Sequence, residues 1–106
     1  MSRKLLCIFL LFTVNIFAQN QGNLSGRVID SETGFGLEGA TIQIQNSDFY
    51  TITDQNGNFK IADIPTSSFN VTASFIGFKS QTKFNVIVKS AGNQSLQYIL
   101  NPSSEI

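Results

Sequence analysis

Apolar and polar residues alternate one by one along most of this sequence. The alternation is clear in 69–75 and in 84–88, where every second residue is apolar. A strand with one buried face repeats every two residues, whereas an amphipathic helix repeats every 3.6. No segment sustains the helical repeat, so the chain is predicted to be all-β. The same alternation predicts that Phe84, Val86 and Val88 share one buried face.

Turn-forming residues interrupt the alternation at short intervals, as expected between the strands of a sandwich. Strands of this number and length predict a seven-stranded antiparallel β-sandwich with Greek-key-like connections, over residues 24–100. Residues 19–23 are a short lead before the first strand, and 101–106 form a polar tail. The residues predicted to build the structural turns are Gly34, Gly39, Asn56, Gly57 and Gly77.

The stretch from Asp54 to Pro65 allows two interpretations, a calcium loop or a tight hairpin. A calcium loop of the EF-hand type needs glycine at its sixth position and glutamate at its twelfth. Counted from Asp54, Gly57 is fourth and Pro65 is twelfth, so the spacing fails. Asn-Gly is instead the preferred pair for a two-residue hairpin turn, in which both residues have positive φ. The sequence therefore predicts a hairpin around Asn56 and Gly57, and no metal site.

The N-terminal segment 1–18 has the layout of a secretory signal peptide. A short basic head precedes an uncharged, mostly apolar run over 5–14, and the small residue Ala18 precedes the predicted cleavage point. The run is shorter than the roughly 20 residues that a membrane-spanning helix needs, so a retained anchor is disfavoured. The chain is predicted to be exported, to begin at Gln19 once mature, and to contain no membrane span in that form.

Composition argues against two classes of function. Loss of Arg3 and Lys4 with the signal peptide leaves five basic and seven acidic residues, and no basic cluster that could neutralise the phosphates of nucleic acid. The chain has no histidine, and its single cysteine, Cys7, lies in the signal peptide. The usual imidazole bases and thiol nucleophiles are therefore missing. Two carboxylates could still meet as a glycosidase pair, but most of them lie near predicted turns. We expect a protein without enzymatic activity or cofactors.

Four aromatic residues lie near predicted loops: Phe35, Phe49, Tyr50 and Phe78. An exposed cluster of such side chains could stack on a sugar or contact a partner protein. The alternative, which we favour, is that Phe49 and Phe78 cover the ends of the sandwich core.

Several short motifs follow one another in a characteristic order along the predicted strands. They are Gly26, Val28 and Asp30; Thr33, Gly34 and Leu37; Gly39 and Ala40; Thr53, Asp54, Gly57 and Phe59; Ile64 and Pro65; and Ser74, Gly77 and Phe78. In this order and spacing the chain resembles the carboxypeptidase-regulatory-like domain, a transthyretin-like sandwich, from about Leu24 to Leu100. Members often carry proline beside the leucine of the second loop, whereas Gly36 and Glu38 flank Leu37 here. A more flexible loop is therefore expected.

The resemblance implies a domain without chemistry of its own. Such domains follow the signal peptide of many TonB-dependent outer-membrane receptors, especially glycan importers of Gram-negative bacteria, and also follow the catalytic domain of some metallocarboxypeptidases. Here the predicted signal peptide leads directly into the domain, which favours the receptor arrangement. The implied role is an accessory domain in nutrient import at the periplasmic face of the outer membrane.

The partners implied by the resemblance are the plug and barrel of the receptor, or periplasmic proteins. The tail 101–106 would then begin a linker to the plug. An autonomous periplasmic or surface binding module, secreted or held at the cell surface, is the alternative.

Overall fold

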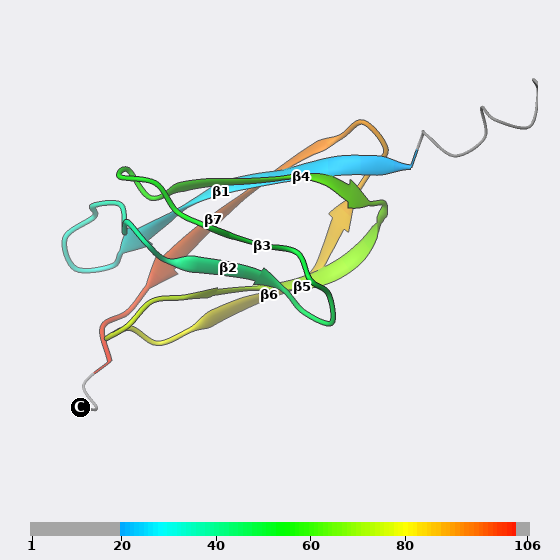
Figure 1. Ribbon diagram of the computed structural model, residues 1–106. Coiled ribbons are helices and arrows are strands. Elements are labelled where there is room, and N and C mark those ends of the chain that lie inside the picture. The colour runs from blue at the N-terminus through cyan, green and yellow to red at the C-terminus, as the bar shows by residue number, and fades with distance from the viewer. Residues whose placement is uncertain (1–19, 104–106) are drawn as a thin grey trace, which may run out of the picture.

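The computed structural model describes residues 20–103, which form seven strands and no helix (Figure 1). Accordingly, none of these residues belongs to a helix of the length and apolarity that crossing a membrane requires. The predicted signal peptide and its cleavage point lie outside the described residues. The strands are β1 (Gln21–Asp30), β2 (Thr41–Ile44), β3 (Tyr50–Ile52), β4 (Asn58–Pro65), β5 (Ser67–Ser74), β6 (Gln81–Val88) and β7 (Asn93–Leu100).

The strands form two sheets, one in the order β4-β1-β7 and the other in the order β3-β2-β5-β6. The prediction of an all-β sandwich is confirmed, and the first strand begins at Gln21, three residues before the alternation does. Apolar side chains from both sheets meet in one buried layer, as the alternation requires. Its largest fully buried side chains are Tyr98, Leu24, Ile42, Ile44, Ile64, Leu100, Val28 and Val71.

The sandwich is not antiparallel throughout. Strands β1 and β7 pair in parallel, from Asn23 opposite Asn93 to Asp30 opposite Leu100. A tight hairpin enforces antiparallel pairing, but no short connection joins these two strands, so their direction is free of that constraint. The prediction of an entirely antiparallel sandwich was wrong at this pair.

The turn at Asn56 and Gly57 is not the predicted hairpin, because its two arms belong to different sheets. Strand β3 pairs with β2, whereas β4 pairs with β1, so the turn carries the chain across the sandwich. Gly57 has a φ of +81°, but Asn56 is not among the residues with positive φ. The carboxylate of Asp54 explains the difference, since its Oδ1 accepts bonds of 2.9 Å from the N–H groups of Asn56 and Asn58. This bonding selects a turn with one left-handed residue.

A β-bulge at Asn85 reverses the expected orientation of Phe84. Asn85 has a φ of +56°, and the pairing of β5 with β6 shifts register beside it. Asn70 Oδ1 accepts a bond of 3.1 Å from the Asn85 N–H, which satisfies the displaced amide. One extra residue exchanges inward and outward positions before the bulge. Phe84 is therefore exposed rather than buried, and Lys83 turns toward the interior.

Candidate interaction surfaces

The described residues hold no group of three or more His, Cys, Asp or Glu side chains that could bind a metal ion. At the position that most resembles a calcium loop, Asp54 directs its Oδ1 to two backbone N–H groups of its own turn. The carboxylate therefore has a structural role in the turn.

Added calcium is expected to leave the melting temperature of the protein unchanged. Asp54→Ala is expected to lower the free energy of unfolding by about 1–2 kcal/mol, because two amides lose their acceptor. Thermal melts of both proteins with and without millimolar calcium test this. A calcium-dependent rise in the unmutated protein that Asp54→Ala abolishes would establish the metal site.

Four of the motif residues, Val28, Leu37, Ala40 and Thr53, are connected by hydrogen bonds at one end of the sandwich. Thr53 is buried, and its Oγ1 accepts a bond of 2.9 Å from the Ala40 N–H and donates to the Leu37 carbonyl. The Leu37 N–H donates to the Val28 carbonyl at 2.9 Å. Both backbone groups of Leu37 are therefore bonded, which argues against the expected looseness of its loop. These residues stabilise the fold, and their polar groups are hydrogen-bonded within the protein rather than exposed to a ligand.

The four glycines predicted to build turns all have positive φ: 76° at Gly34, 85° at Gly39, 81° at Gly57 and 85° at Gly77. Their surroundings differ. A Cβ on Gly57 would lie 2.3 Å from the Val28 carbonyl oxygen, whereas nothing lies within 4 Å of one on Gly34 or Gly77. Gly57 alone of these three sits inside packed backbone.

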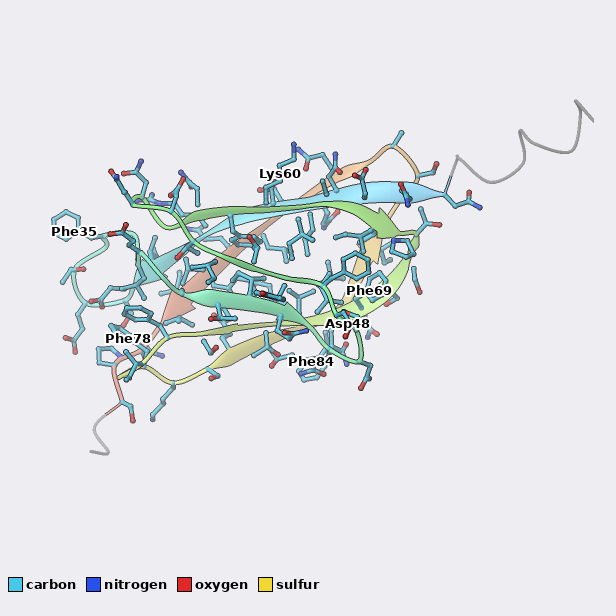
Figure 2. All side chains as sticks on the ribbon, in the orientation of Figure 1. Phe35, Asp48, Lys60, Phe69, Phe78 and Phe84 are labelled. Carbon is cyan, nitrogen blue, oxygen red and sulfur yellow. The ribbon has the colours of Figure 1, made fainter. Side chains whose placement is uncertain are left out.

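The four loop aromatics do not form one exposed cluster. Phe49 and Phe78 pack against the core, and the ring centres of Phe75 and Phe78 are 5.7 Å apart. The interpretation that Phe49 and Phe78 cover the core is confirmed. Phe35 projects from the loop end (Figure 2). Tyr50 is exposed on β3.

The outward side of the β3-β2-β5-β6 sheet, here called the outer face, has apolar margins. Tyr50 and Ile52 on β3 form one margin, and Phe84 and Ile87 on β6 form the other; Tyr50 is 62% exposed and Phe84 68%. Alternation placed Ile87 on this outward side but Phe84 on the buried side, because it carries no sign of the bulge. The only signal was the run Val86-Ile87-Val88, in which strict alternation fails.

Between its margins the outer face consists of polar side chains that hydrogen-bond to one another, here called the polar floor. Gln43 lies opposite both Tyr50 and Thr72, and Thr72 lies opposite Thr82. Gln45 Nε2 donates to Thr72 Oγ1 at 2.9 Å, and Thr72 and Thr82 share a bond of 2.8 Å between their hydroxyl oxygens. No outward position on these four strands carries a charge. Such a face can be covered without removing an ion from water.

The fold and the motif residues agree with one known family. Residues 24–106 match the CarboxypepD_reg-like domain, and the chain belongs to that family. It is 35% identical to carboxypeptidase D of Rattus norvegicus over 80 residues, which are 76% of this chain and 6% of that protein. The chain thus spans a small part of the relatives that it matches. The domain is of the regulatory, non-catalytic type.

Solved structures share the sandwich at low sequence identity. Catechol 1,2-dioxygenase from Pseudomonas arvilla C-1 matches with a TM-score of 0.64 and 13% identity, over 87% of this chain and 55% of that one. A chain of the type II cohesin-X-dockerin complex from Acetivibrio cellulolyticus matches with a TM-score of 0.63 and 18% identity, over 74% of this chain and 56% of that one. These likenesses concern the fold alone.

Proposed function

We propose that this chain is the non-catalytic accessory domain of a TonB-dependent outer-membrane receptor for nutrient import. The observation that carries the proposal is the outer face, where apolar margins flank a floor without charges. Apolar side chains gathered on an exposed face favour contact with another surface. Family membership and the complete lack of histidine support a role in contact rather than chemistry.

Two further features support the receptor rather than an autonomous module. The segment 1–18 has the layout of an export signal, which agrees with a periplasmic location. The apolar margins lie on two strands, β3 and β6, at opposite sides of one sheet. A rigid neighbouring domain could cover both margins at once, and the plug or the barrel of a receptor would supply such a neighbour.

The genomic reading frame that contains this sequence tests the proposal. If the domain belongs to a receptor, the frame is expected to continue into a plug domain and then into alternating strands of about ten residues, as a transmembrane barrel requires. A stop at codon 106 followed by unrelated genes, with a monomeric protein in the periplasm, would contradict the receptor and favour the autonomous module.

A further inference from the structure

A shallow groove of about 570 Å³ runs between β6 of one sheet and β7 of the other. It is distinct from the polar floor of the outer face and shares only the β6 margin with it. The residues that line it are Lys83, Phe84, Asn85, Val86, Ile87, Lys89, Gln94 and Leu96.

The two strands beside the groove are edge strands of different sheets. Edge strands present unpaired backbone N–H and C=O groups, to which an extended peptide can bind. At one end the gap is bridged, since the Ile99 N–H donates to Gln81 Oε1 at 3.2 Å. The groove begins beyond that bridge. Its apolar side chains Val86 and Leu96 could accept the alternate side chains of an added strand.

The charges of the groove have one sign. Lys83 and Lys89 line it, and none of the eight lining residues is acidic. Lys83 is half-buried, and its Nζ lies 5.3 Å from the centre of the Tyr98 ring. The ring face compensates part of the ammonium charge, but a half-buried cation gains more from a carboxylate.

The same charges decide between possible occupants. A second copy of this chain pairing edge to edge along β6 would bring a second Lys83 and Lys89 to the groove, and an inward-pointing lysine on an edge strand opposes such pairing. A neutral glycan would leave the two ammonium groups without a counter-charge. The carboxylates of an acidic peptide can pair with both ammonium groups. The backbone of the same peptide can hydrogen-bond to the unpaired N–H and C=O groups of the edge strands.

We propose that the β6–β7 groove binds an extended, acidic and apolar peptide segment of a partner protein. Its backbone pairs with the exposed edges, its apolar side chains contact Val86 and Leu96, and its carboxylates contact Lys83 and Lys89. The site does not depend on the proposed receptor, because an autonomous module would present the same groove.

The test uses the isotope-labelled exported protein and a blocked octapeptide that alternates Val and Glu. The amide signals of 83–89 and 93–96 are expected to shift on titration, and the affinity is expected to fall as salt rises. Joint replacement by Lys83→Gln and Lys89→Gln is expected to raise Kd by about tenfold, and Lys89→Gln alone by about threefold. Lys60→Gln, which changes an exposed lysine on β4, is the matched control and is expected to leave Kd unchanged.

Since Lys89 is exposed, Lys89→Gln keeps the test valid even if loss of the Lys83 contact with Tyr98 impairs folding. Equal shifts with a blocked octapeptide that alternates Val and Lys would overturn the proposal. So would the absence of shifts at millimolar peptide, or shifts confined to another face. Shifts of 83–89 that follow protein concentration alone would assign the groove to self-association instead.

Discussion

Replacing Gly57 by alanine is expected to lower the free energy of unfolding by about 3 kcal/mol. The residue has a φ of +81°, which costs about 1–2 kcal/mol for a side chain other than glycine. Its Cβ would also lie 2.3 Å from the Val28 carbonyl oxygen and 2.8 Å from the Gly36 Cα. Such overlap inside packed backbone costs about 1–3 kcal/mol more. Denaturant unfolding of both proteins measures the difference.

Gly34→Ala is the matched control, because Gly34 has a similar φ of +76° and nothing within 4 Å of an added Cβ. It is expected to cost only the conformational part, about 1–2 kcal/mol. Equal losses for the two variants would show that the chain around Gly57 is not packed against Val28 and Gly36 as described. The comparison therefore tests the contact that joins the turn to the neighbouring loop.

Tyr98→Ala is expected to cost about 3–5 kcal/mol, since Tyr98 is fully buried and links the two sheets. It lies on β7, and its hydroxyl donates a bond of 2.6 Å to the Val71 carbonyl on β5. Tyr98→Phe keeps the ring and loses only this bond, so about 1–2 kcal/mol is expected. Unfolding in denaturant at neutral pH separates the two contributions.

The same tyrosine should make the protein less stable at high pH. Burial raises the pKa of the Tyr98 phenol above its ordinary value of 10.0. As the pH rises, the unfolded chain therefore loses this proton before the folded protein does. The stability that the protonated Tyr98 contributes is complete below about pH 10 and falls above it, by up to about 1.4 kcal/mol per pH unit. Tyr98→Phe is expected to have a shallower decline above pH 10. Equal declines in both proteins would contradict this assignment.

Alternation predicted the buried faces of β2 and β5 correctly, because a strand with one buried face must repeat every two residues. Ile42 and Ile44, and Val71 and Ala73, are buried as the pattern requires. The parallel pairing of β1 with β7 was not predictable, because it depends on which strands from opposite ends of the domain meet. Whether the Asn56-Gly57 turn joins strands of one sheet or crosses between the two sheets also depends on which distant strands pair.

The β-bulges account for most of the differences between the predicted and the observed positions of surface side chains. Asn85 and Asp63 both have positive φ, with values of 56° and 60°. In each case an asparagine of the facing strand accepts the bulged N–H, Asn70 for Asn85 and Asn23 for Asp63. Asparagine and aspartate tolerate this conformation, but many of them in the chain do not adopt it. The exposure of Phe84 on the outer face and the inward turn of Lys83 beside the groove both depend on the bulge at Asn85, so neither could be predicted.

Site-specific photo-cross-linking in the intact exported protein tests most directly whether the outer face is a contact surface. A photo-reactive benzoylphenylalanine would replace Tyr50, Phe84 or, as a control, Lys60, which lies on the opposite side of the molecule (Figure 2). Irradiation in the cell is predicted to give a defined adduct from the first two positions and none from the third. The same diffuse pattern from all three positions, or no adduct from any, would contradict a function through the outer face.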